Sequence, residues 1–313
     1  MSKRSKNIVK IIVSLILVGW LIFSVNWKEV LRYLIGVNFY FLLLFVILYV
    51  VGILISSYKW KILANFKGFS QPFYFFVKTY VLGIFLNNFF PSFVGGDTYR
   101  VVALGRAEKK IHSSASSVVF DRVSGLLTAM ILGVVFGLFN LGVMEKFAIW
   151  NYFIYGVGVV LLIVAGLAYF YPSKFVQRIS GFLPKVISKH FEELSEYRNF
   201  KIIFFSMIWA TGFSFVGLAF CNYVLFAAVG INIGVLNYLS VIFFISIISS
   251  VPISVGNIGV KEWAYIAFFG IFGVPSSAAI SVVILSRVIQ LLVSLVALPL
   301  YLQDTKMEEK IGN

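Results

Sequence analysis

The sequence predicts an all-α integral membrane protein with six full transmembrane helices and two broken, re-entrant helical hairpins arranged as an inverted repeat. Three observations predict this fold class. Apolar residues make up 60% of the 313-residue chain and charged residues only 12%, whereas soluble domains carry roughly 25% charge. Several apolar stretches are long enough to cross a bilayer. Two others are interrupted halfway by Pro, Gly and Asn.

Composition also excludes several classes of site. Cys221 is the one cysteine, and the two histidines, His112 and His190, lie far apart, so disulfide scaffolds and zinc sites are not expected. The formal net charge of +14 is assigned to loops that face an anionic leaflet and not to nucleic-acid binding. No Gly-x-Ser-x-Gly, His-Glu-x-x-His or Walker A motif occurs, and the sequence predicts neither an enzyme nor a cofactor or metal.

Each full span is predicted from an apolar window, because about 20 helical residues cross about 30 Å of hydrocarbon. The first window follows a basic N-terminus but has no small-residue cleavage site, which predicts an uncleaved span with its N-terminus in the cytoplasm of a cell (inner) membrane protein. The predicted full spans lie near residues 8–25, 39–58, 117–141, 149–171, 203–229 and 276–302.

Loop charge predicts how the two broken regions lie in the membrane. Segments 59–72 and 98–112 are both basic, so region 73–105 leaves and re-enters the cytoplasmic side. The basic stretch 172–201 is also cytoplasmic, either as an amphipathic helix on the membrane surface or as a solvated connector. Region 237–272 is then a hairpin from the opposite face, and the C-terminus is cytoplasmic.

The two broken regions predict an internal repeat. Within one membrane domain, 1–313, the first repeat covers 39–141 and the second covers 203–302, and the charge pattern gives them opposite orientations. Inverted repeats that meet at broken helices are typical of secondary transporters, although Pro and Gly also simply kink membrane helices. The residues that break the hairpins are Pro91, Gly95 and Gly96 in the first repeat and Pro252, Gly256, Asn257 and Gly259 in the second.

Two arginines lie at corresponding positions inside apolar windows. An arginine within a bilayer costs at least about 2.5–3.5 kcal/mol unless it finds a partner or water, so Arg122 and Arg287 are expected to face the interior. One interpretation is a structural ion pair, with Asp121 or Glu262 as counter-ion. The other is a shared phosphate-binding site between the two repeats, since a guanidinium matches phosphate oxygens.

Four further charged residues follow the breaks directly: Asp97, Arg100, Lys261 and Glu262. They are interpreted as helix caps and ion pairs, or as groups that bind a zwitterionic or cationic head group or relay a proton. An alignment of the two breaks places Arg100 opposite Lys261.

The order of these motifs resembles the flippase-like membrane family that includes the transmembrane region of lysylphosphatidylglycerol synthetase. The resemblance rests on Asn87-Asn88-Phe-Phe-Pro91, on Gly95-Gly96-Asp97-x-x-Arg100, on Asp121-Arg122, on the segment from Pro252 to Glu262, and on Arg287. It adds Asn87 and Asn88 to the substrate-binding candidates.

The resemblance implies movement of a lipid with a polar head group between leaflets. It leaves the lipid open among anionic or aminoacylated phospholipids and polyprenyl-phosphate lipids. The sequence stops at Asn313 without the soluble aminoacyl-transfer domain of the bifunctional synthetases, so aminoacylation is not expected. The alternatives are a membrane-embedded head-group or glycosyl transferase and an accessory subunit of a lipid-modifying system. A homo-oligomer or a separate synthase partner remain open as assemblies.

Overall fold

The structure is entirely helical in the part of the chain that it describes. The computed structural model describes residues 3–88, 94–145, 154, 156–160, 197, 199–251 and 253–299, and these contain helices and no strand. The predicted all-α membrane class is confirmed. The predicted span 149–171 and connector 172–201 lie almost wholly outside the described residues, as do Pro91 and Pro252.

The chain begins with two helices that meet at a sharp bend. Helix α1 covers Lys3–Ser24 and α2 covers Trp27–Ile35, and their axes differ by 83°. The bend falls at Asn26, whose side chain accepts hydrogen bonds from the first main-chain N–H groups of α2. Helix α2 packs against a later helix, α15, and α1 packs against α14, and a small apolar cluster that includes Leu21, Val30 and Ile280 joins them.

Two runs of helices then follow in the same order: one long, two short, one long. The first run consists of α3 (Phe39–Phe66), α4 (Phe73–Asn87), α5 (Val94–Ala107) and α6 (Ile111–Leu138), followed by the short α7 (Leu141–Met144). The second consists of α11 (Phe200–Phe213), the π-helix η2 (Ser214–Phe220) and α12 (Cys221–Ala228), then α13 (Val235–Ser250), the 3-10 turn η3 (Val255–Asn257), α14 (Val260–Gly270) and α15 (Ser276–Ser294).

Helix length separates the candidate membrane spans from the shorter apolar helices. Four helical runs are long and apolar enough to cross a membrane, and α1 with α2 makes a fifth if the bent pair counts as one span. These four are Phe39–Phe66, Ile111–Leu138, Phe200–Ala228 and Ser276–Pro299. By contrast, α4 and α13 have 15 and 16 residues, and at 1.5 Å per residue they extend only about 22–24 Å.

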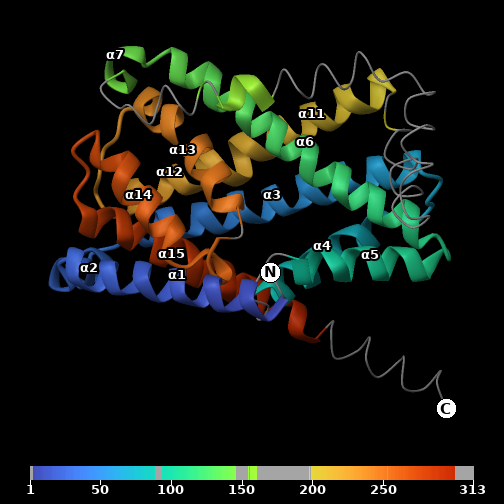
Figure 1. Cartoon of the computed structure of the whole chain (residues 1–313), viewed down its shortest axis with the longest axis horizontal. Coiled ribbons are helices and arrows are strands. Elements are labelled where there is room, and N and C mark those ends of the chain that lie inside the picture. The colour runs from blue at the N-terminus through green and yellow to red at the C-terminus, as the bar shows by residue number, and fades with distance from the viewer. Residues whose placement is uncertain are drawn as a thin grey trace.

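Each hairpin has its own apolar core. Trp60, Phe76 and Leu104 are fully buried between α3, α4 and α5, whereas a larger cluster around Phe226 and Phe243 joins α12, α13 and α14. Figure 1 shows α4 and α5 side by side at one end of the molecule and α13 and α14 at the other, with α3 running between.

The long helices of the two runs cross at a pair of glycines. A Cβ atom built on Gly52 of α3 would lie 2.6 Å from the Cα of Gly217 in the π-helical turn, so any larger residue would push the helices apart. Gly217 follows Gly52 by 165 residues. The separation between the arginines of the two runs, Arg122 and Arg287, is the same.

The helix bounds show that several basic residues assigned to loops lie on helices. Helix α3 continues to Phe66, so Lys59 and Lys61 lie on the helix and not in a loop. Likewise α5 includes Arg100, because this helix ends only at Ala107. The basic residues that remain between α3 and α4 and between α5 and α6 include Lys67 and Lys109.

Candidate functional site

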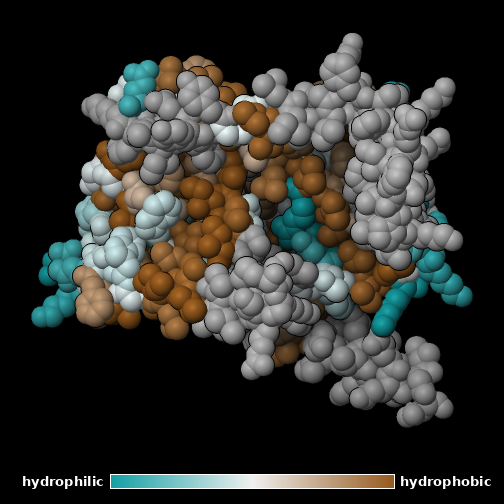
Figure 2. Space-filling model, in the orientation of Figure 1, coloured by the Kyte–Doolittle hydropathy of each residue, from teal (hydrophilic) through white to brown (hydrophobic). Residues whose placement is uncertain are grey.

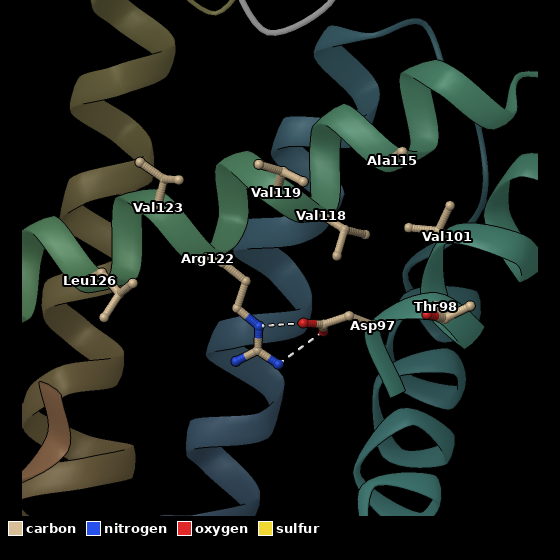
Figure 3. A pocket seen from close by; sticks show the side chains of 9 residues that line it. All are labelled: Asp97, Thr98, Val101, Ala115, Val118, Val119, Arg122, Val123 and Leu126. Carbon is tan, nitrogen blue, oxygen red and sulfur yellow. Dashed lines mark hydrogen bonds and ion pairs between the residues drawn. The ribbon is translucent and has the colours of Figure 1, made fainter. Parts of the chain in front are cut away.

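An acidic residue and an arginine face each other between α5 and α6. Arg122 donates from Nε to Asp97 Oδ2 at 2.8 Å and from Nη2 to Asp97 Oδ1 at 2.9 Å, which is a bidentate ion pair (Figure 3). Asp97 lies in the first turn of α5, where the helix dipole favours a carboxylate. The Arg122 side chain is 48% exposed, so this pair lies at the surface of the described structure.

A second arginine holds the same carboxylate from the buried side. Arg100 Nη1 donates to Asp97 Oδ1 at 3.2 Å, and Nη2 donates to Asp121 Oδ2 at 2.8 Å. The guanidinium contacts two aromatic rings, 4.3 Å from the centroid of Trp60 and 4.5 Å from that of Tyr80. Only 2% of Arg100 is exposed. Its position is therefore fixed by ion pairs to two carboxylates and by contacts with two aromatic rings.

Lys59 completes this network. Its ammonium lies 3.0 Å from Asp121 Oδ1 and donates to the Asp121 main-chain oxygen at 2.8 Å. Lys59 and Asp121 are both buried, and a buried charge is tolerated only when it is paired. The linked groups are Lys59, Arg100, Arg122, Asp97 and Asp121. They comprise three cations and two carboxylates.

A close contact between α4 and α5 positions Asp97. A Cβ atom on Gly96 would lie 2.1 Å from the main-chain oxygen of Gly83, so glycine is required where the two hairpin arms touch. The Gly96 N–H donates to Asn87 Oδ1 at 2.8 Å, which gives the start of α5 a partner at the end of α4. The predicted break residue Gly95 also lies in this first turn.

The Arg122–Asp97 pair forms the polar part of an otherwise apolar groove. The groove has a volume of about 320 Å³. In Figure 3 the arginine side chain extends from α6 toward α5, and apolar residues of α6 continue on either side of it. Figure 2 shows a hydrophilic recess within the hydrophobic surface near α4 and α6. The lining residues are Asp97, Thr98, Val101, Ala115, Val118, Val119, Arg122, Val123 and Leu126.

The second run of helices repeats the acid–arginine pair at the same spacing. Arg287 Nε donates to Glu262 Oε1 at 2.8 Å, and Glu262 precedes Arg287 by 25 residues, as Asp97 precedes Arg122. By the ion pairs, Glu262 in the second run corresponds to Asp97 in the first. The sequence alignment of the two breaks instead made Lys261 correspond to Arg100, so its register differed from that of the ion pairs.

The surroundings of the second pair differ from those of the first. Arg287 also donates from Nη1 to the main-chain oxygen of Gly256 at 3.2 Å and from Nη2 to that of Asn257 at 2.9 Å. Both residues have positive φ, +59° and +55°, and the Asn257 side chain donates to the Ser249 main-chain oxygen. Glu262 Oε2 accepts from the N–H of Gly259, the residue before α14. These contacts stabilise the turn at the second break, between α13 and α14.

The remaining predicted residues have separate partners. Lys261 donates to Ser286 Oγ at 3.0 Å and lies 5.6 Å from the Tyr265 ring centroid. Asn88 donates to Ser294 Oγ at 2.9 Å and so joins the end of α4 to α15. Among the described residues, no hydrogen bond or ion-pair network joins Arg122 to Arg287, so a direct contact does not assemble the predicted shared site.

Sequence reasoning named Arg100 and Asp121 but missed Lys59, the third buried charge of the first network. It counted Lys59 as a loop charge and named Asp121 or Glu262, not Asp97, as the counter-ion of Arg122. Trp60 and Tyr80 were not singled out at all. The available signal was the pair Lys59-Trp60 inside the long apolar run that continues to Phe66, because a charge there needs a buried partner.

The fold and the site define a class of polytopic α-helical membrane protein in which each of two broken hairpins presents a carboxylate to an arginine on the next long helix. The chain belongs to the family described as the lysylphosphatidylglycerol synthase TM region, which matches residues 7–297. This confirms the family indicated by the sequence motifs.

Two archaeal proteins are similar to the chain over most of their length. A UPF0104 membrane protein of Methanocaldococcus jannaschii is 25% identical, with 92% of this chain and 91% of the relative covered. A UPF0104 membrane protein of Pyrococcus horikoshii is 22% identical, with 91% of this chain and 92% of the relative covered. No solved structure matches the chain.

Proposed function

We propose that the protein moves a phosphate-containing polar lipid between the leaflets of the cell membrane, and that it is not an enzyme. The observation that carries this proposal is the half-exposed Arg122, which lies in an apolar groove on the outer surface of α6. An arginine in contact with hydrocarbon is costly, and a lipid phosphate would supply the anion that lowers this cost.

The groove suits both parts of such a lipid. Val119, Val123 and Leu126 of α6 line it and are 37–45% exposed, so they offer an apolar surface to an acyl chain. Arg122 provides guanidinium donors to the phosphate, and Thr98 adds a hydroxyl at the edge. Phosphate is the feature shared by anionic and aminoacylated phospholipids and by polyprenyl-phosphate lipids.

The paired hairpins support an inverted repeat as the framework for transport. Gly52 and Gly217 are 165 residues apart, as are Arg122 and Arg287, and the two glycines touch. Equivalent residues that contact one another lie beside the axis that relates two halves, so we place a pseudo-two-fold axis at this crossing. The proposed membrane arrangement has six full spans and hairpins from opposite faces, with both termini cytoplasmic.

Transport by purified protein in liposomes tests the proposal. Vesicles would carry fluorescent phosphatidylglycerol, and its exposure in the outer leaflet would be followed by a membrane-impermeant quencher. We expect faster exchange with the unmodified protein than with Arg122→Gln. Glu145→Gln, which changes an exposed charge beyond α7, is the matched control and should retain exchange.

Mass spectrometry of the lipids from the same vesicles separates transport from chemistry. Exchange without any change of lipid mass supports translocation. A lipid product of altered mass would replace the proposal with a head-group or glycosyl transferase. Equal exchange in protein-free vesicles and in vesicles with the unmodified protein would refute it.

A further inference from the structure

The two arginines of the repeat differ in the donors that they leave open. Arg287 uses Nε, Nη1 and Nη2 on one carboxylate and two main-chain oxygens. Arg122 uses Nε and Nη2 on Asp97, and within the described residues its Nη1 edge has no partner. Arg122 is also the more exposed of the two, at 48% against 32%. Among the described contacts, the arginine of the first half therefore leaves more of its donors open to a ligand.

We propose that Asp97 is an internal competitor for the lipid phosphate: the phosphate displaces Asp97 from Arg122, and Arg100 retains the displaced carboxylate. This inference rests on the proposed function and deepens it. The phosphate first meets the open Nη1 edge of Arg122 and then takes the Nε and Nη2 donors that Asp97 occupies. Arg100 is thus a positioning residue, because it acts on the lipid only through Asp97.

The geometry around Asp97 allows this exchange without an unpaired carboxylate. Asp97 Oδ1 accepts from both arginines, at 3.2 Å from Arg100 Nη1 and 2.9 Å from Arg122 Nη2. Arg100 cannot follow Arg122 toward a ligand, because Asp121 and the two rings hold its guanidinium in place. When Arg122 turns to a phosphate, Asp97 keeps a charged partner that does not move.

The charge of the network indicates which phosphate it accepts. Its three cations and two carboxylates leave one uncompensated positive charge. One lipid phosphodiester, which carries a single negative charge, neutralises the network. A phosphomonoester carries about −1.5 to −2 at pH 7 and would overcompensate it. The proposed ligand class is therefore a lipid phosphodiester.

Equilibrium binding of short-chain lipids to the full-length protein in detergent tests this exchange. The probes are dioctanoyl phosphatidylglycerol, dioctanoyl phosphatidic acid, dioctanoylglycerol and inorganic phosphate, each measured by native mass spectrometry. For Asp97→Asn we expect phosphatidylglycerol to bind about tenfold more tightly, which corresponds to about 1.4 kcal/mol of binding free energy. The affinity for phosphatidic acid should rise by a larger factor, because the variant network carries one more positive charge. The affinity for dioctanoylglycerol should not rise.

A double-mutant cycle isolates the role of Arg100. Arg100→Lys keeps the charge but loses the forked contact to Asp97 and Asp121, so Asp97 should hold Arg122 more strongly and phosphatidylglycerol affinity should fall. In the Asp97→Asn background the same change should have little effect on affinity. If Asp97→Asn does not fold, the fall in Arg100→Lys remains as the test. Glu145→Gln controls for loss of one negative charge elsewhere.

The outcomes distinguish this inference from the proposed function. Unchanged or weaker phosphatidylglycerol binding in Asp97→Asn would overturn the exchange, as would an equal gain for dioctanoylglycerol or an Arg100→Lys effect that is the same in both backgrounds. If the unmodified protein bound neither phospholipid, the lipid site itself would fail. Competition by inorganic phosphate as strong as by the lipids would assign the site to free phosphate and overturn the lipid assignment.

Discussion

Replacing Gly96 with alanine should destabilise the protein, because the hairpin arms α4 and α5 touch there. The new Cβ atom would lie 2.1 Å from the Gly83 main-chain oxygen, and side chains essentially never approach closer than 3.0 Å, so the arms must separate by about 0.9 Å. Overpacking of this kind costs about 1–3 kcal/mol. Weakening the Gly96 N–H to Asn87 hydrogen bond costs about 1 kcal/mol more.

The expected net loss is smaller than the sum of these costs. Alanine has a higher helix propensity than glycine, which offsets up to about 1 kcal/mol, so Gly96→Ala should lose about 1–3 kcal/mol of unfolding free energy. Unfolding by sodium dodecyl sulfate in mixed micelles, followed by circular dichroism, measures this difference. The same variant should remain helical before the transition, because the change lies at one contact between helices.

Gly212→Ala in α11 is the matched control. A Cβ atom there would meet only Ile55 Cγ2 at 3.8 Å, which is an ordinary contact, so helix propensity should dominate and stabilise the protein by up to about 1 kcal/mol. The reasoning fails if Gly96→Ala loses less than about 0.5 kcal/mol, or if the two variants shift stability in the same direction by similar amounts.

Three further predictions follow from described contacts. Arg287→Lys should lose about 1.5–3 kcal/mol of unfolding free energy, because lysine cannot reproduce the contacts to two main-chain oxygens; a loss below about 0.5 kcal/mol would contradict the structural role. The Ser70 N–H donates to Glu108 and lowers the pKa of that carboxyl. The ionised Glu108 carboxylate therefore stabilises the folded protein at pH values above its unfolded pKa, and this stabilisation is lost as the pH falls through its lower folded pKa. Denaturation at a series of acidic pH values should show this loss in the unmodified protein and not in Glu108→Gln. On a cysteine-free background, single cysteines replacing Lys67 and Lys109 should react with an impermeant maleimide from the same side, and opposite sides would refute the first hairpin.

The sequence predicted the membrane class and the two breaks because both depend on local composition. Apolar windows indicate spans directly, and Pro or Gly inside such windows marks where a helix ends. Helices α4 and α13, of 15 and 16 residues, lie in the two regions that were expected to be broken, and the six full spans stay a prediction. The exact ends of the helices could not be predicted from hydropathy. Hydropathy falls at Lys59, whereas α3 continues to Phe66.

The partner of each charge could not be predicted from spacing along one helix. Asp97 and Arg122 are 25 residues apart and lie on different helices, so their contact depends on how α5 and α6 pack. Asp121 is adjacent to Arg122 in sequence, but adjacent residues on a helix point in different directions, and Asp121 meets Arg100 and Lys59 instead. The sequence identified the charged residues of the site, and packing decided their pairs.

The same acid–arginine pair has different support in the two halves, and this difference assigns their tasks. In the second half, the carboxylate of Glu262 accepts from the Gly259 N–H, and Arg287 donates to Glu262 and to two main-chain oxygens of a turn with positive φ, so the pair stabilises a break. In the first half, Asp97 is held by the buried Arg100, and Arg122 keeps an open edge in an apolar groove. A carboxylate with a second, immobile cation can release its first one at low cost, whereas an arginine with three protein partners cannot turn away without exposing main-chain oxygens. We therefore propose that the acid–arginine pair, which occurs twice at the same spacing, exchanges ligands in the first half and stabilises a turn in the second.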